Sequence, residues 1–293
     1  MRHLYQCPMR WADLDLLGHV NNVVYVDYLQ EARVDLMRSL FPAPAGVQDD
    51  LADGVVVVRH EVTYLAPLTL TLRPVSIECW VTEVRAASFT MAYEVFHDDP
   101  GSDGGRHVYL RATTLLTPYV FATERPRRLR PDERGTLEPY VEPAVGIPAA
   151  PLPSVDRTVG HRYPLHVRFS DVDVYRHVNN VKYFEYFQES RVRLMDDLTR
   201  GTAAAESGPG FVVVQTDVDY RRPILLRPEP YDVWAEIARV GTRSMTIESE
   251  IADGETLLAR SRVTLVFYDA DTGRSTEPTA AMRDVLAGAT RTS

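Results

Sequence analysis

The chain has 293 residues, enough for two domains of average size, and with 45% hydrophobic and 25% charged residues its composition is that of an ordinary globular protein. A formal net charge of −9 argues against general nucleic-acid binding, which requires a clustered basic face. No stretch approaches the ~20 apolar residues of a membrane span, and the first residues lack the apolar core of a secretory signal. We therefore expect a cytoplasmic protein.

The first predicted elements along the chain are a short strand, a polar loop and a long helix. The loop reads Arg-Trp-Ala-Asp-Leu-Asp-Leu-Leu-Gly-His-Val-Asn-Asn over residues 10–22. Apolar residues then recur at helical spacing at positions 26, 29, 36 and 40. Because Asn is a good N-cap residue and Pro42 cannot continue a helix, we predict a helix over about residues 21–40.

Four β-branched, partly alternating segments follow the helix, and short turns such as Arg85-Ala-Ala connect them. They predict strands over residues 55–65, 75–84, 89–96 and 108–116. Short connections favour antiparallel pairing, and one long helix against one antiparallel sheet is an α+β domain. This first domain is predicted over residues 1–121.

Residues 122–160 are rich in Pro, Ala and Arg, a composition typical of an extended linker. Four arginines stand close together in it, at positions 125, 127, 128 and 130. Such a run is either a solvated loop or a contact for a polyanionic ligand, and we name Arg127 and Arg128 as candidate substrate contacts.

The remainder of the chain repeats its beginning. Residues 168–180 match residues 10–22, and 16 of the 29 pairs that start at positions 9 and 167 are identical. A second helix is predicted over about residues 179–199, with Gly201 as its C-terminal cap. Strands are predicted over residues 211–220, 231–240, 245–251 and 257–268. The chain is therefore a duplication whose second domain spans residues 161–278, with a tail over 279–293 that contains a short helix at 280–286.

The repeated motif, running into a helix with Glu-Ala-Arg, resembles the opening of the 4-hydroxybenzoyl-CoA-thioesterase-like hotdog family, which includes acyl-CoA and acyl-ACP thioesterases. The likeness covers both copies almost whole. It implies two tandem hotdog domains, each a long central helix wrapped by an antiparallel sheet, which form an intrachain pseudo-dimer. It also implies hydrolysis of acyl thioesters of coenzyme A or of a carrier protein.

The resemblance assigns catalysis to the second Asp of the loop, which is Asp15 in the first copy and Asp173 in the second. It implies that a backbone N–H at the helix start binds the thioester carbonyl, and this N–H corresponds to that of Asn22 in the first copy and Asn180 in the second. Such chemistry is physically sound, because a helix N-terminus offers unpaired N–H groups to an oxyanion. An Asp on the preceding loop orients or deprotonates water, although at a pKa of ~3.9 it needs burial to be an effective base.

The motif also resembles that of plant acyl-carrier-protein thioesterases, Asp-x-Asn-x-His-Val-Asn-Asn, in which the Asp, the middle Asn and the His have roles. On that likeness His19 and His177 are catalytic candidates, with structural hydrogen bonding as the alternative. Leu17 and Tyr175 stand in place of the middle Asn. A mechanism that needs this amide is therefore in doubt.

The remaining candidate substrate contacts are Asn21, Asn179, Ser88 and Ser244. The alternative interpretation is a helix cap for each asparagine and a turn role for each serine. Asp13 and Asp171 are expected to cap the loop. The pairs Glu31/Arg33 and Glu189/Arg191 are expected as charge pairs at a helix surface or interface, and Tyr64 and Tyr220 as core or pocket wall.

Cofactors and metals are not predicted, because the eight histidines show no metal-ligand spacing and the two cysteines, Cys7 and Cys79, are expected as small buried thiols. Two other functions stay open: an acyl-thioester hydratase or dehydratase on the same fold, and a non-catalytic acyl-thioester binder. The acyl group, the carrier and any further homo-oligomer are also open.

Overall fold

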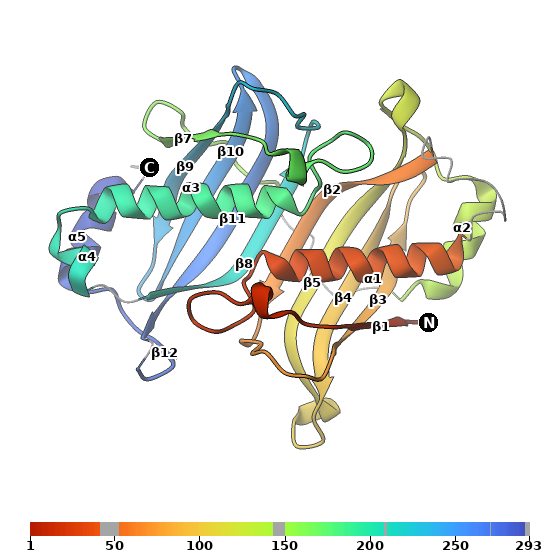
Figure 1. Cartoon of the computed structure of the whole chain (residues 1–293), viewed down its shortest axis with the longest axis horizontal. Helices are drawn as coiled ribbons and strands as arrows, with labels where there is room; N and C mark the ends of the chain where they lie inside the picture. The colour runs from red at the N-terminus through yellow and green to blue at the C-terminus, as the bar shows by residue number, and fades with distance from the viewer. Residues whose placement is uncertain (42–52, 143–149, 208–209, 270, 291–293) are drawn as a thin grey trace. The chain divides into compact units, whose positions relative to one another are not determined.

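The computed structural model of the chain describes residues 1–41, 53–142, 150–207, 210–269 and 271–290 (Figure 1). It divides into two compact units, Met1–Ala149 and Ala150–Ser293. Each unit places one long helix across one antiparallel sheet, which confirms the predicted α+β class for both copies.

The first unit has the sheet order β1-β3-β4-β5-β2, and every neighbouring pair is antiparallel. Its main elements are β1 (His3–Cys7), α1 (Val24–Leu40), β2 (Asp53–Tyr64), β3 (Val75–Val84), β4 (Phe89–Asp98) and β5 (Arg106–Val120). Short elements complete it: η1 (Trp11–Asp13), η2 (Asp103–Gly105), η3 (Phe121–Thr123), β6 (Arg125–Pro126), α2 (Pro131–Leu137) and η4 (Glu138–Tyr140). The predicted strands are confirmed, with β3 at its predicted bounds.

The second unit repeats this arrangement with the antiparallel order β7-β9-β10-β11-β8. Its main elements are β7 (His161–Leu165), α3 (Lys182–Thr199), β8 (Gly210–Tyr220), β9 (Tyr231–Val240), β10 (Ser244–Asp253) and β11 (Thr256–Asp269). Short elements are η5 (Phe169–Asp171), α4 (Ala203–Ser207), β12 (Arg274–Ser275) and α5 (Ala280–Ala289). Gly201 follows α3 with φ of +73°, which fits its predicted capping role.

Matched irregularities bend the two sheets in the same way. Val58 is an extra residue in β2 against β5, and Val214, its counterpart, is an extra residue in β8 against β11. Thr82 is likewise an extra residue in β3 against β4, and Ala238, its counterpart, is an extra residue in β9 against β10. A bulge increases local twist and curvature, so these positions let each sheet curve around its helix.

The helices bury a broad face, and this face includes an unexpected arginine. Leu29 and Leu36 of α1 are fully buried, as their spacing predicts. Arg33 is only 6% exposed and its counterpart Arg191 only 9%, so of the two predicted places, a helix surface or an interface, the surface is wrong for these arginines. The reason is geometric: an arginine four residues after Leu29 and three before Leu36 lies on the same stripe of the helix.

The segment predicted as an extended linker is partly structured. Its arginine run contains β6, which pairs with β5, and α2 begins at Pro131, a residue well suited to the first turn of a helix. The guanidinium of Arg127 donates two hydrogen bonds to the Glu133 carboxylate, at 2.7 and 2.8 Å. The expectation of an extended linker is therefore wrong for residues 125–140, because specific contacts outweigh its Pro-rich composition.

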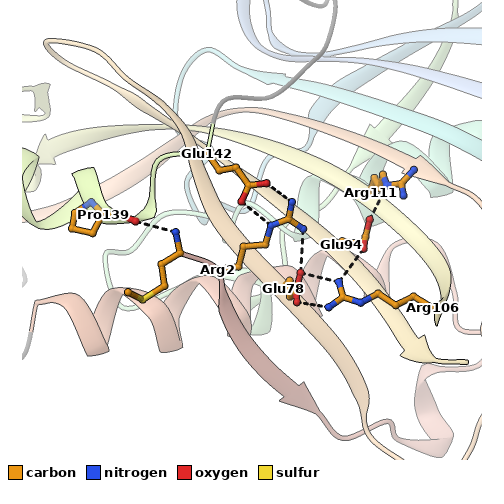
Figure 2. Close-up of polar contacts among 8 residues, drawn as sticks. Arg2, Glu78, Glu94, Arg106, Arg111, Pro139 and Glu142 are labelled. Atoms are coloured by element: carbon orange, nitrogen blue, oxygen red, sulfur yellow. Dashed lines mark hydrogen bonds and ion pairs between the residues drawn. The ribbon is translucent and has the colours of Figure 1, made fainter. Parts of the chain in front are cut away.

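An ion network ties the end of this segment to the outer face of the first sheet (Figure 2). Arg2 bonds both Glu142 and Glu78, and Arg106 bonds Glu78 and Glu94. Arg111 of β5 completes the chain by donating to Glu94 at 2.9 Å. The second sheet repeats the last pairing, since Arg260 donates to Glu250 at 2.8 Å. Arg111 and Arg260 therefore occupy matching places in the two copies.

The described part of the tail, residues 279–290, packs against the second unit's core. The helix predicted over 280–286 extends to Ala289, and the Thr279 side chain caps it by accepting from Met282 N–H at 3.2 Å. Leu286 is fully buried among residues of β9, β10 and β11. Both cysteines are free and buried, as predicted. None of the helices among the described residues has the length and apolarity to cross a membrane.

Candidate active sites

The loop before α1 is a tight turn that presents one carboxylate. Asp15 N–H donates to His19 O at 2.8 Å, and Gly18 N–H donates to Asp15 O at 3.0 Å. The side-chain Oδ1 of Asp15 accepts from the N–H groups of Leu17 and His19, at 2.8 and 3.2 Å. No described residue hydrogen-bonds the second oxygen, Oδ2. The half-buried carboxylate thus has one oxygen fixed and the other able to meet a ligand or water.

The other aspartate of the motif anchors this turn. Asp13 is 2% exposed, and its carboxylate accepts from Arg10 N–H at 2.7 Å and from the Tyr28 hydroxyl of α1. Its carbonyl accepts Asn21 N–H at 2.8 Å. In the second copy Asp171 accepts from Tyr186 at 2.7 Å in the same way. These contacts confirm the expected capping role for both residues.

The helix start is built by the two asparagines and a tyrosine. Asn21 closes the turn before it, because its carbonyl accepts Val24 N–H at 2.9 Å and its side chain accepts Val23 N–H at 3.3 Å. The N-cap position itself is Val23, so the expected capping role of Asn21 is wrong by two residues. The helix therefore begins at Val24, three residues after the predicted start at 21. The Tyr64 hydroxyl donates to Asn22 O at 2.8 Å. Asn22 N–H, the predicted oxyanion donor, has no acceptor among the described residues.

The second copy reproduces this geometry. Asp173 N–H donates to His177 O at 2.8 Å, and Asp173 Oδ1 accepts Tyr175 N–H at 2.9 Å. Asn179 closes the turn before α3, where its side chain accepts Val181 N–H at 3.3 Å, and Val181 stands at the N-cap position. Tyr220 donates to Asn180 O at 2.9 Å, as Tyr64 does to Asn22.

Electrostatics distinguish the second carboxylate. Burial raises the pKa of Asp173 above its usual range, against the opposing effect of the Tyr175 and His177 backbone hydrogen bonds and of the nearby His177 charge. A raised pKa makes a carboxylate a better proton acceptor, which is the property that a loop aspartate needs to act as a base. The His177 effect also places its ring within electrostatic range of Asp173. In the first copy, no hydrogen bond to the His19 ring occurs among the described residues.

The remaining candidates are not all brought to the helix starts. Ser88 precedes Phe89, which pairs across the sheet with Leu116 of β5, and Leu116 in turn pairs with Val57 of β2. Tyr64 lies seven residues beyond Val57 on β2. At ~3.3 Å per residue, Ser88 is roughly 23 Å along the strands from Tyr64. Ser244 occupies the matching hairpin in the second unit and accepts Gly241 N–H at 2.7 Å through its carbonyl. Within their own units, both serines lie at the opposite end of the strands from the helix start.

Arg127 and Arg128 also lie at that opposite end of the first unit. Arg127 N–H donates to Pro118 O at 2.9 Å, and Leu129 N–H donates to Ala86 O at 3.0 Å, beside the β3–β4 turn. Arg127 is held by Glu133, whereas the Arg128 side chain is exposed. Their role in substrate binding, like that of Ser88 and Ser244, stays a prediction.

Tyr64 and Tyr220 are the residues whose place the sequence did not settle. Each ends the strand next to its site, and each is followed by a short segment with a proline three positions on. This repeated Tyr-x-x-Pro was visible as a signal. Its contact with the helix start depends on the fold and could not be read from spacing alone.

In the first domain, a free carboxylate oxygen on a loop and an N–H without an acceptor among the described residues define a site for polarising and attacking a carbonyl group. The second domain repeats the aspartate turn and the tyrosine-held helix start. The chain belongs to the thioesterase-like superfamily, whose family model matches residues 9–146 and 167–287. This family and the two antiparallel units confirm the tandem hotdog fold.

Similar proteins include the long-chain acyl-CoA thioesterase FadM of Escherichia coli, 26% identical over 125 residues, which are 42% of this chain and 93% of that protein. YsmA of Bacillus subtilis, an uncharacterized protein, is 27% identical over 125 residues, 41% of this chain and 80% of its own. Among solved structures, a 12:0-ACP thioesterase from Umbellularia californica aligns with a TM-score of 0.70 at 18% identity, over 90% of this chain and 96% of its own. An acyl-ACP thioesterase from Bacteroides thetaiotaomicron gives 0.65 at 15% identity, over 90% and 97%. The two structures support the fold.

Proposed function

We propose that the protein hydrolyses acyl thioesters of coenzyme A or of acyl carrier protein, with one site at each helix start. One observation carries this proposal: in both copies a half-buried Asp lies on the loop that leads into the helix, and a tyrosine hydroxyl holds the backbone carbonyl of the asparagine at the helix start. Its family and its likeness to FadM, an acyl-CoA thioesterase, support the reaction class.

In the proposed reaction the thioester carbonyl oxygen accepts the N–H of Asn22 or Asn180. The positive end of the helix dipole favours the negative charge that develops there. Asp15 or Asp173 either takes a proton from the attacking water or attacks the carbonyl itself. The new C–O bond forms, the C–S bond breaks, and the thiolate leaves and is protonated by solvent. Attack by water gives the free acid directly; attack by the carboxylate gives an acyl-aspartyl anhydride, which a water molecule then hydrolyses to the free acid and the regenerated aspartate. Because a thiolate leaves easily, the site needs no strong general acid. His177 acts by favouring the charged form of Asp173, and His19 is its counterpart in the first site.

The proposal extends to a cytoplasmic enzyme of fatty-acid metabolism that needs no cofactor. Two free buried cysteines fit a reducing compartment. The pairing of the two domains as a pseudo-dimer, and any further oligomer, stay predictions.

A thiol-release panel tests the function. Acyl-CoAs and acyl carrier proteins of graded chain length are offered to the wild-type protein and to a chain carrying both Asp15→Asn and Asp173→Asn. Release of free thiol by the wild type, and its loss in the double variant, supports the proposal. Hydration of an enoyl thioester without thiol release would instead identify a hydratase, and tight binding without any turnover would identify a binder.

A further inference from the structure

Two loops surround each helix start, and we call them the site loops: residues 15–20 with 65–69 in the first unit, and 173–178 with 221–225 in the second. In the second unit Val178 N–H donates to Ile224 O at 2.9 Å, and His177 bridges Leu225. In the first unit Val20 N–H donates to Leu68 O at 2.8 Å. Because the pairing is the same, the residues of the two pairs of loops correspond one to one.

Their charges do not correspond. The first pair of loops carries Asp15 as its only Asp, Glu, Lys or Arg. The second pair carries Asp173 and three arginines, where the first has small or apolar residues: Arg176 for Gly18, Arg221 for Leu65 and Arg222 for Ala66. In a chain of net charge −9, this is a local basic surface beside one site only.

Two of these arginines have guanidinium groups available to a ligand. Arg221 is partly neutralised by Asp219, at 2.9 Å. Arg176 and Arg222 are exposed, and the described residues provide neither guanidinium with an ion pair or hydrogen bond. The loop connections place both beside the start of α3, since Tyr220, two residues before Arg222, bonds Asn180.

Arg176 also occupies a backbone conformation that arginine disfavours. Its φ is +66°, and the first copy uses Gly18 at φ of +76° for the same turn. A non-glycine residue in this region costs roughly 1–2 kcal/mol. Residues held in such conformations cluster at functional sites. An arginine kept here, where glycine fits without strain, points to a task for its side chain.

We propose that the second site binds the nucleotide phosphates of coenzyme A through Arg176 and Arg222, and that the first site lacks this contact. The inference rests on the proposed thioesterase function and divides its two sites by carrier recognition. Guanidinium groups suit the task because their planar N–H donors match phosphate oxygens in pairs. The adenosine 3′-phosphate and diphosphate form a compact polyanion that two neighbouring loops can contact together. Free pantetheine, which lacks these phosphates, should not distinguish the sites.

Calorimetric titration with two probes, free coenzyme A and pantetheine, tests this at low salt. The variant Arg176→Gly/Arg222→Ala gives the second site the residues of the first at these two positions. We expect about tenfold weaker binding of coenzyme A, a shallower dependence on salt, and unchanged binding of pantetheine. The control Arg193→Ala/Arg283→Ala removes the same charge from exposed positions on α3 and α5 and should stay within about twofold of wild type.

Equal affinity of wild type and variant for coenzyme A would overturn the proposal, as would an equal loss in the control, which would indicate a diffuse field. Unchanged coenzyme A binding with slower hydrolysis of acyl carrier protein would assign the arginines to the acidic surface of that protein instead. Because the titration needs no turnover, its result is separate from the thioesterase test.

Discussion

The site loops of the two units have the same backbone hydrogen bonds and differ in their exposed side chains. The turn closed by Asp15 and that closed by Asp173 have equal hydrogen bonds, 2.8 Å to the His carbonyl and 3.0 Å back to the Asp carbonyl. Both helix starts receive a tyrosine hydroxyl, at 2.8 and 2.9 Å. What changes is the set of side chains that face solvent, such as Gly18 against Arg176.

This difference separates two functions of one loop. Backbone geometry and the aspartate set the proposed chemistry, and the hydrogen bonds that close the turn leave them little room to change. The exposed side chains of Arg176 and Arg222 take no part in these bonds, so these positions can differ without loss of the turn. On our proposal, the two domains share one reaction and differ in their contact with the phosphates of coenzyme A.

The largest effect expected is the loss of the two aspartates. Asp15→Asn and Asp173→Asn should each remove part of the turnover, and together nearly all of it. Loss of a general base or nucleophile typically slows a reaction by at least ~10²-fold, about 2.7 kcal/mol of barrier. Thiol release from the best substrate measures this, with the thermal midpoint as the folding control. A double variant that keeps most of its activity would exclude Asp as the catalytic group.

The tyrosines provide a smaller and symmetric test. Tyr64→Phe in an Asp173→Asn chain and Tyr220→Phe in an Asp15→Asn chain each remove one hydroxyl from a helix-start carbonyl. A net loss of about 1 kcal/mol predicts a fall in kcat of roughly fivefold at either site. Because the two bonds are equal, the two losses should be equal. A large loss at one site alone would show that the tyrosines are not equivalent.

The sequence predicted the fold well because the duplication tested every pattern twice. Strands β3 and β9 have their predicted bounds, since uninterrupted β-branched runs end at clear turns. Arg33 was misplaced because charge suggested the surface while its position on the helix stripe decided burial. The structure of residues 125–140 was missed because contacts such as that of Arg127 with Glu133 are invisible to composition.

The sequence brings candidate site residues together where they are local in the chain, while their catalytic roles stay predictions. Asp15 and Asn22 stand in one motif, so the fold brings them to one helix start almost by necessity. The same motif predicted nothing about Arg222, because its place beside the site depends on a loop 40 residues away from the helix start at Lys182. Non-local contacts of this kind require the structure.

The strained turn gives a test by stability. Gly18→Arg should lower the free energy of unfolding by roughly 1 kcal/mol, because it introduces a side chain at φ of +76°. Arg176→Gly relieves the same strain but adds the backbone entropy of glycine, ~0.5–1 kcal/mol, so a near-neutral or slightly positive change is expected. Urea denaturation measures both, and Gly18→Ala separates strain from charge. An unaffected Gly18→Arg protein would contradict the argument from strain.

The smallest expected effect is a displaced pH profile at the second site. In an Asp15→Asn chain only Asp173 works, and it must be ionised to accept a proton or attack a carbonyl. Burial raises the pKa of Asp173, so kcat/KM should begin to fall, as pH decreases, above the range of an ordinary Asp near ~3.9. The sign for stability follows from the same shift. The folded state binds the proton more readily than the unfolded state, so the ionised carboxylate destabilises the fold at neutral pH, and this cost disappears below the unfolded pKa. Asp173→Asn should accordingly be at least as stable as wild type at pH 7, with a difference that shrinks towards acid. An acid limb at or below the ordinary Asp range would mean that Asp173 is solvated in the working enzyme.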